Sequence, residues 1–250
     1  MPAVWQPTLK MRLLGGDRLL GCLLRMPADE TVEMLGEAGF DFVVIDAEHG
    51  PADLIGLRTH LALAQLHSMP ALVRVGSVEP ALVLRTLDAG AEGVIAPHLD
   101  TAAQARALVA SARYPPTGLR GFATYGRAGG FGRVEPREHL RTAQENTVVF
   151  GMIESPLGVA NAAEILSVPG LDGTMVGIAD LRASSTPADP DPAEAIRQVH
   201  EVAARLGRFR MDIVNSTEQA RASFSDGAQL VVYNLTATFM HHLAALREAL

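Results

Sequence analysis

The sequence predicts an α/β fold, a (β/α)8 TIM barrel, from three observations. Eight short apolar runs recur at fairly regular spacing along the 250 residues. Several of these runs are continuous rather than alternating, as expected for parallel strands that are buried on both faces. Helical patterns separate most of the runs, and a regular alternation of strand and helix is typical of a barrel with its helices outside.

The expected strands and helices follow one another along most of the chain. The strand-like runs are residues 19–24, 40–46, 71–75, 93–97, 148–153, 173–178, 209–214 and 229–234. The helical patterns are residues 29–38, 51–67, 79–88, 101–113, 192–206, 217–224 and 238–250. Thr101 is a candidate N-cap. Glycines lie where several of these helices should stop, at positions 39, 90, 207 and 227.

A doubly wound sheet is the alternative fold. It is disfavoured because no Gly-x-Gly-x-x-Gly follows an early strand. The glycine-rich stretch 126–132 lies in a long loop, and we interpret it as a mobile loop near the site rather than a phosphate cradle. No second domain is apparent, so residues 1–250 are predicted to form a single barrel domain.

Composition and charge exclude several classes of partner. The net charge of −7 argues against a nucleic-acid or membrane surface, which needs a basic patch. No 18-residue apolar span is present, and residues 1–5 do not resemble a secretion signal. Cys22 is the only cysteine and lies inside an apolar run, which predicts a core thiol. A cytoplasmic location is therefore expected.

The single lysine, Lys10, limits the chemistry that the chain can perform. A Schiff-base enzyme needs a desolvated lysine in its site, whereas Lys10 precedes the first strand-like run. Imine catalysis is therefore not expected. A metal ion remains as a way to stabilise a carbanion next to a carbonyl group.

Two carboxylates follow neighbouring strand-like runs. Glu154 comes directly after residues 148–153, and Asp180 follows residues 173–178 closely. The carboxyl ends of barrel strands gather around one mouth, so both acids can share a hard divalent cation. No His-x-x-x-His or cysteine pair offers a zinc site, which favours Mg²⁺ or Mn²⁺, with Co²⁺ as a further candidate. The alternative is that each acid caps the helix that follows it.

A cation lies in the third run. Arg74 is flanked by apolar residues, and a desolvated guanidinium needs an anion. A substrate carboxylate suits its fork geometry. An internal salt bridge with Asp46 or Glu48 is the alternative.

Histidines follow the second and fourth runs, where they can transfer protons near neutral pH. His49 precedes Gly50-Pro51, and His98 occupies the corresponding position on the fourth run. The alternative for each is a hydrogen-bonded loop histidine. Asp88 ends a helix, where an anion is disfavoured, so it should have a partner. Spacing alone does not choose between His49 and an arginine as that partner.

Five segments together resemble the HpcH/HpaI aldolase family, the metal-dependent class II pyruvate aldolases typified by 4-hydroxy-2-oxoheptanedioate aldolase. The matching segments are residues 39–49 (GFDFVVIDAEH), 87–93 (LDAGAEG), 113–121 (RYPPTGLRG), 153–154 (IE) and 179–181 (ADL). They run in family order over roughly residues 10 to 185. The Tyr-Pro-Pro segment with its trailing Arg-Gly is the most specific of them.

The resemblance implies a role for several residues. Glu154 and Asp180 would hold the divalent metal. His49 would be the catalytic base, with Asp88 raising its basicity. The arginine that stabilises the transition state corresponds to Arg74.

The resemblance also implies a substrate and an assembly. A small 2-oxo acid would chelate the metal, and Ala179 would bind it through its backbone; Met152 and His98 complete the expected substrate-binding set. The family's members are often hexamers with an exchanged C-terminal helix. A homo-oligomer, a hexamer or trimer of dimers, is therefore expected, with residues 238–250 as the candidate for exchange.

Departures from the family pattern bear on the substrate. Met152 replaces the usual glutamine and cannot donate a hydrogen bond. Ile178 and Arg182 also differ from the usual residues, and His98 stands where an apolar residue is common. The acceptor pocket is therefore expected to be rebuilt.

The expected function is a metal-dependent carbon–carbon lyase that cleaves or forms 4-hydroxy-2-oxo acids through a pyruvate-type enolate. One alternative is a condensing synthase on the same scaffold, similar to the citrate-forming members of siderophore pathways. In that enzyme His98 and Arg182 could meet an extra carboxylate. A second alternative is a non-catalytic barrel used for binding.

Overall fold

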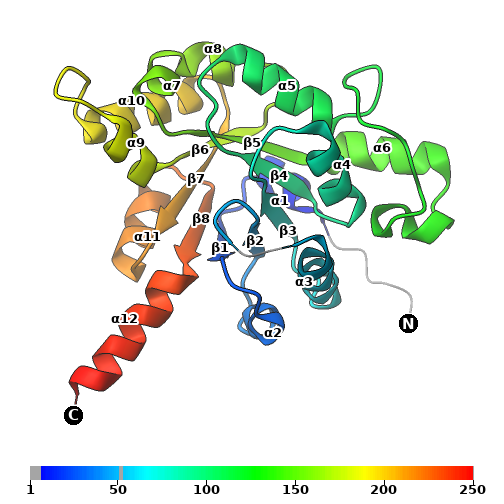
Figure 1. Cartoon of the computed structure of the whole chain (residues 1–250), viewed down its shortest axis with the longest axis horizontal. Helices are drawn as coiled ribbons and strands as arrows, with labels where there is room; N and C mark the ends of the chain where they lie inside the picture. The colour runs from blue at the N-terminus through cyan, green and yellow to red at the C-terminus, as the bar shows by residue number, and fades with distance from the viewer. Residues whose placement is uncertain (1–6, 51–52, 250) are drawn as a thin grey trace.

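Eight parallel strands form a closed barrel in the computed structural model, which describes residues 7–50 and 53–249. Each strand pairs with the next along the chain, and β8 pairs with β1 (Figure 1). The strands are β1 (Leu19–Leu24), β2 (Phe42–Asp46), β3 (Ala71–Arg74), β4 (Gly93–Ala96), β5 (Val148–Ile153), β6 (Gly173–Val176), β7 (Phe209–Val214) and β8 (Leu230–Asn234). The predicted (β/α)8 barrel is confirmed, and the doubly wound sheet is excluded.

Helices surround the barrel. They are α1 (Leu9–Leu14), α2 (Asp29–Glu37), α3 (Leu54–Leu66), α4 (Pro80–Asp88), α5 (Ala102–Ala112), α6 (Pro136–Asn146), α7 (Pro156–Ala160), α8 (Ala162–Leu166), α9 (Ile178–Ser184), α10 (Pro192–Arg205), α11 (Thr217–Ser225) and α12 (Leu235–Glu248), with a 3-10 segment η1 (Arg127–Gly132). Every predicted helix is present, although α12 begins before residue 238 and α3 begins after residue 51. Residues 51, 52 and 250 of these predictions lie outside the described residues.

Both faces of the strands are buried, which explains their continuous apolar runs. Along β2, Phe42 and Val44 point into the barrel, and Val43 and Ile45 pack against the outer helices. Helix α1 closes the amino-terminal end of the barrel, because Leu9 belongs to the interior cluster. Burial raises the pKa of the Cys22 thiol to about 12, so this residue is a core thiol as predicted.

The C-terminal helix α12 leaves the body of the barrel. It starts beside β8 and then projects outward (Figure 1). Four of its large apolar side chains are exposed: Phe239, Met240, Leu243 and Leu246. Within residues 7–50 and 53–249, no helix has the length and apolar character needed to cross a membrane.

Candidate active site

The carboxyl ends of the strands bring most of the predicted site residues to one mouth. Arg74 ends β3, Glu154 follows β5, and His98 lies two residues beyond β4. Glu48, two residues after β2, lies between them: its carboxylate oxygens lie 3.2 Å from Arg74 Nε and 3.6 Å from His98 Nε2. His49 joins the same group, with Nε2 3.7 Å from a Glu48 oxygen.

Arg74 is held by an internal salt bridge, which is the alternative that the sequence left open. Its Nε donates to Asp46 Oδ1 at 2.9 Å, and its Nη2 donates to Asp46 Oδ2, with both side chains buried. Burial alone would raise the pKa of Asp46, but the bonds and charge of Arg74 hold that pKa below its usual value. The remaining amine, Nη1, lies 3.8 Å from the Met152 sulfur. Nη1 is therefore the one guanidinium nitrogen without a carboxylate partner among the described residues.

Glu154 is a buried carboxylate in surroundings that disfavour its charge. Burial, together with the negative charges of Glu48 and Asp180, raises its pKa, although hydrogen bonding and charge from His98 oppose this shift. The backbone N–H of His98 donates to Glu154 Oε1 at 2.6 Å. The ionised form of Glu154 therefore costs folding free energy above its raised pKa, and a bound cation would offset that cost.

Asp180 lies in the first turn of α9, not at the end of a strand. The predicted run 173–178 is two residues too long, because Ile178 already begins this helix. A helix N-terminus favours a negative charge. A side chain at Gly177 would collide with the Glu154 carboxylate, so glycine lets α9 approach that acid closely.

Neither acid caps a helix through its side chain. Helix α7, after Glu154, is capped by Ser155, and α9 has no side-chain capping bond. No group of three or more potential ligands among His, Cys, Asp and Glu forms within the described residues. The two carboxylates fit a hard divalent cation that leaves most of its positions to water and substrate oxygens. They do not fit a closed zinc cage.

Both histidines at the mouth are accessible. The side chain of His49 is 55% exposed and that of His98 is 62% exposed. His98 has a left-handed backbone, with φ of 54°, which is uncommon for a residue other than glycine. Its ring Nδ1 lies 3.0 Å from Glu154 Oε1. This strained backbone points both the amide and the ring of His98 toward the acid.

Two predicted substrate-binding residues differ in accessibility. Met152 is buried inside the barrel, with its sulfur near Arg74. Ala179 is exposed in the first turn of α9, where backbone N–H groups have no partner within the helix. Ala179 can therefore offer a backbone donor to an anion, whereas Met152 shapes an apolar wall.

Asp88 does not meet His49 within this chain. Helix α4 starts after the carboxyl end of β3 and returns to the start of β4, so its last residue, Asp88, lies at the opposite end of the barrel from the mouth. There Arg120 Nη2 donates to Asp88 Oδ1 at 2.6 Å, and the Arg120 guanidinium stacks 4.5 Å from the Tyr114 ring centre. The partner of Asp88 in the chain is the arginine, one of the two options.

Within one chain the glycine-rich loop also lies at the far end of the barrel, and not near the mouth as the sequence predicts. A side chain at Gly126 would meet the Asp88 carbonyl at 2.6 Å, and one at Gly90 would meet the Arg127 side chain at 2.9 Å. The loop therefore packs at the end of α4. Its composition could not fix this place, because it has no hydrophobic period to orient it.

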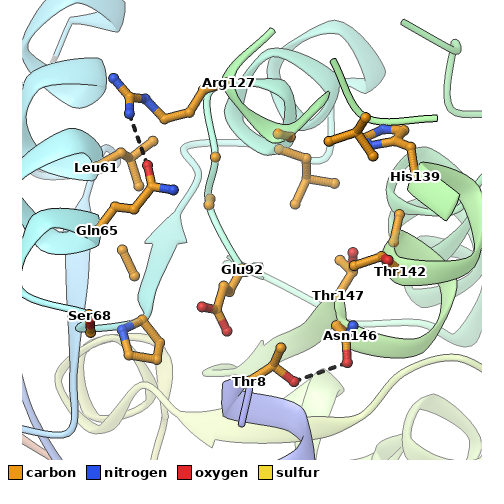
Figure 2. Close-up of a pocket in the computed structure, with 18 of the residues that line it drawn as sticks. Thr8, Leu61, Gln65, Ser68, Glu92, Arg127, His139, Thr142, Asn146 and Thr147 are labelled. Atoms are coloured by element: carbon orange, nitrogen blue, oxygen red, sulfur yellow. Dashed lines mark hydrogen bonds between the residues drawn. The ribbon is translucent and has the colours of Figure 1, made fainter. Parts of the chain in front are cut away.

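A cavity of about 640 Å³ lies at the same amino-terminal end (Figure 2). Its lining includes Ser68 and Glu92, which precede β3 and β4, but no predicted site residue. Glu92 points into it and accepts a hydrogen bond from the Leu9 N–H at 3.0 Å. This bond satisfies a free donor at the start of α1. The cavity is therefore separate from the mouth where the catalytic side chains gather.

Sequence reasoning missed a second arginine at the mouth. Arg25 follows β1 directly, and its Nε donates to Asp46 Oδ2 at 2.9 Å. The signal was present, because Arg25 follows an apolar run just as Glu154 does. Glu48, expected from the sequence only as a possible partner of Arg74, also lies beside both histidines.

Comparisons with known proteins agree with this barrel fold. The HpcH/HpaI aldolase/citrate lyase family model matches residues 21–239. A hydroxypyruvate/pyruvate aldolase from Roseobacter denitrificans is 33% identical over 90% of this chain and 89% of its own length. A 5-keto-4-deoxy-D-glucarate aldolase from Klebsiella pneumoniae is 34% identical over 92% of this chain and 90% of its own.

Two solved structures share the fold over nearly the whole chain. An HpcH/HpaI aldolase/citrate lyase family protein from Burkholderia cenocepacia has a TM-score of 0.88 at 33% identity, covering 96% of this chain and 98% of that one. The citrate synthase SbnG has a TM-score of 0.86 at 27% identity, covering 98% of this chain and 97% of that one.

These similarities define the class of protein as a barrel enzyme of the aldolase and lyase type. This chain belongs to the HpcH/HpaI aldolase/citrate lyase family. The alternative of a non-catalytic barrel is thereby removed, and the predicted resemblance is confirmed.

Proposed function

We propose that this protein is a divalent-metal-dependent aldolase that cleaves or forms 4-hydroxy-2-oxo acids. The single observation that carries the proposal is buried Glu154, whose carboxylate lies among other acids at the barrel mouth. Relatives named as hydroxypyruvate/pyruvate and 5-keto-4-deoxy-D-glucarate aldolases support this substrate class. A cytoplasmic location and the lack of nucleic-acid or membrane partners stay predictions from composition.

Glu154 and Asp180 would hold the metal, with Mg²⁺ or Mn²⁺ favoured and Co²⁺ a further candidate. When bound, the cation supplies positive charge that stabilises the negative charge developing on the keto oxygen of the substrate. The negative charge of Glu48 lies close enough to contribute to the raised pKa of Glu154. The donor chemistry, two hard oxygens on an open mouth, supports an oxygen-preferring ion.

Arg74 would orient the substrate with Nη1, the nitrogen whose contact is the Met152 sulfur and not a carboxylate. Asp46 fixes the guanidinium through two of its nitrogens, so Nη1 is presented in a constant direction. The exposed backbone at Ala179 would bind the substrate carboxylate from the other side. Such positioning by preorganised donors lowers the reorganisation needed during reaction.

His49 would be the base. In cleavage it accepts the proton of the 4-hydroxyl group while the bond between C3 and C4 breaks and its electron pair moves toward the keto group. The C4 hydroxyl carbon leaves as an aldehyde, and C3 is then protonated to give the methyl group of the 2-oxo acid. Glu48, 3.7 Å from His49 Nε2, would orient the ring.

Replacing His49 by Ala should lower the rate of hydrogen exchange at the methyl group of pyruvate by about 10²–10⁴-fold, the usual contribution of a general base. Proton NMR in deuterium oxide with Mg²⁺ measures this exchange. His67→Ala, on an outer helix boundary away from the mouth, serves as the control and should exchange at the wild-type rate. Unchanged exchange in the His49 variant would assign the base to another residue, such as His98.

A homo-oligomer is proposed because one helix exposes an apolar stripe. Phe239, Leu243 and Leu246 of α12 are spaced by four and three residues, so they share one face of the helix, and all are exposed. A second copy of the chain is the proposed cover, in a hexamer or trimer of dimers with α12 exchanged. Any contact between Asp88 and His49 would also need a second copy, because they lie at opposite ends of one barrel.

Leu243→Glu should shift the protein to a smaller assembly, because it places a charge in the apolar stripe. Light scattering after gel filtration measures the mass. Ala245→Glu, on the opposite face of α12, is the matched control and should keep the wild-type mass. A wild-type protein that is monomeric at micromolar concentration would contradict the proposed assembly.

A condensing synthase remains the second candidate, favoured by the similarity to the citrate synthase SbnG. Exposed His98 and Arg182 would then meet an additional carboxylate on the electrophile. Incubation of the Mg²⁺-loaded enzyme with an acyl thioester and a 2-oxo acid separates the two candidates. Thiol release without aldehyde-dependent turnover would favour the synthase.

A further inference from the structure

Arg25 is a second guanidinium at the mouth that no step above uses. It follows β1 directly, and β1 pairs with β2 on one side and β8 on the other. Its Nε donates to Asp46 Oδ2 at 2.9 Å and its Nη1 to Asn234 Oδ1 at 3.1 Å. These contacts from two strand ends fix the direction of the planar group.

The charge of Arg25 exceeds what Asp46 needs. Asp46 already accepts two bonds from Arg74 and the backbone N–H groups of Glu48 and His49, at 3.1 and 3.2 Å. A carboxylate has about four acceptor positions, so these bonds nearly saturate it without Arg25. Arg74 also has Glu48 as an ion-pair partner at 3.2 Å, so Arg25 is not needed to complete the bonds of Asp46 or to balance Arg74.

Arg25 also keeps donors available. Its Nη2 makes no hydrogen bond to the part of the chain that the structure describes, since only its Nε and Nη1 are used. Its side chain is 28% exposed, against 3% for Arg74. Water or a ligand can therefore reach the free side of the Arg25 guanidinium, whereas Arg74 presents a single buried amine.

The position of Arg25 matches the distal end of a substrate. The eight strands close in chain order, so β1 lies opposite β5 across the mouth. Glu154 follows β5, and Arg25 follows β1. A substrate whose oxo-acid end lies beside Glu154 and Asp180 would extend its other end across the mouth toward β1.

We infer that Arg25 determines substrate specificity by binding a second carboxylate at the distal end of the substrate, so that the aldehyde partner of the reaction is an anion. The inference rests on the proposed function and names the substrate class, an oxo acid with two carboxylates. A guanidinium that is fixed on one edge presents its remaining N–H groups to a carboxylate with little loss of entropy. Asn234 acts as a positioning residue for Arg25.

The test compares ligands that differ only at the distal end. Isothermal titration of the Mg²⁺-loaded protein uses 2-oxoglutarate against 2-oxovalerate, and 2-oxoadipate against 2-oxohexanoate; each pair exchanges a carboxylate for a methyl group. The wild type should bind the diacid about tenfold or more tightly in at least one pair, as a charge-assisted hydrogen bond contributes. In Arg25→Gln the affinity ratio of that pair should fall to about one.

Further variants separate this role from a structural one. Arg25→Lys should keep part of the ratio, because the charge remains without the fork. Equal losses for both ligands of a pair in Arg25→Gln, with the ratio preserved, would mean that Arg25 only positions Asp46. Collapse of the ratio in Arg182→Gln instead of Arg25→Gln would assign the carboxylate to α9, and either result overturns the inference.

The same titrations test the role of Arg25 separately from the proposed aldolase function. A wild type that binds the monoacids but shows no preference for either diacid overturns the role of Arg25 alone. A wild type that binds none of the four oxo acids with Mg²⁺ present overturns the proposed function, and the role of Arg25 with it. Circular dichroism melting of each variant confirms that it is folded during the titration.

Discussion

Glu154→Gln should lower kcat/KM of the aldol reaction by about a thousandfold while the barrel stays folded. The substitution keeps the shape of the side chain, and its carbonyl oxygen can still accept the His98 N–H. It removes the negative charge that would hold the cation, and loss of that stabilisation costs several kcal/mol of transition-state free energy, or about three powers of ten in rate.

The thermal stability of the metal-free protein should not fall in Glu154→Gln, although its activity does. Burial raises the pKa of Glu154, so its ionised form destabilises the metal-free fold above that pKa and not below the unfolded value. In chelator at neutral pH, Glu154→Gln should therefore melt at a temperature equal to or higher than the wild type. Adding Mg²⁺ should raise the melting temperature of the wild type but not of the variant.

Kinetics with pyruvate and an aldehyde, together with melting curves, measure both effects. Glu164→Gln makes the same change on the exposed surface of α8 and should alter stability by less than about 0.5 kcal/mol. Activity of Glu154→Gln within tenfold of the wild type would show that this carboxylate does not hold the catalytic cation.

Arg74→Lys should lower kcat/KM by about a hundredfold, a loss of about 2.7 kcal/mol in transition-state stabilisation. Lysine keeps a positive charge but cannot make two parallel bonds to Asp46 and still present Nη1 toward the substrate. The variant should also lose about 1–3 kcal/mol of stability, because Asp46 is buried and loses a bonded partner.

The matched control is Arg85→Lys, the same change on an exposed position of α4. Steady-state kinetics and denaturant unfolding should show both losses for Arg74→Lys and neither for Arg85→Lys. A stable Arg74→Lys protein with the wild-type rate would mean that any cation suffices at this position. The proposed role of the planar guanidinium group would then be wrong. A loss of stability alone would leave Arg74 as a purely structural partner of Asp46.

Many residues of the mouth could be predicted from the sequence. A charged side chain inside or directly after a continuous apolar run is uncommon unless it has an ionic partner or a ligand. This pattern predicts Glu154 and Arg74 as site residues, and the closed barrel explains why their strand ends meet. Arg25 carries the same signal after the first run. An arginine directly after a strand is also common as a solvated surface residue, so this signal alone does not distinguish Arg25 from the other arginines.

Asp88 shows what a single sequence leaves open. Its place at the end of α4 determines which end of the barrel it occupies, since each outer helix runs back from the mouth. The resemblance supplied its pairing with His49, and the topology of one chain separates the two. Asp180 shows a different limit: the apolar residue Ile178 extends the strand-like run into α9, so periodicity alone could not place the boundary.

Hydrogen exchange at the methyl group of pyruvate, followed by proton NMR in deuterium oxide with Mg²⁺ and then with excess chelator, probes enolate formation without any aldehyde. Rapid exchange that stops in chelator and returns on adding Mg²⁺ back is expected if an ion held by Glu154 and Asp180 stabilises the developing charge. Exchange that continues unchanged in chelator would contradict that chemistry.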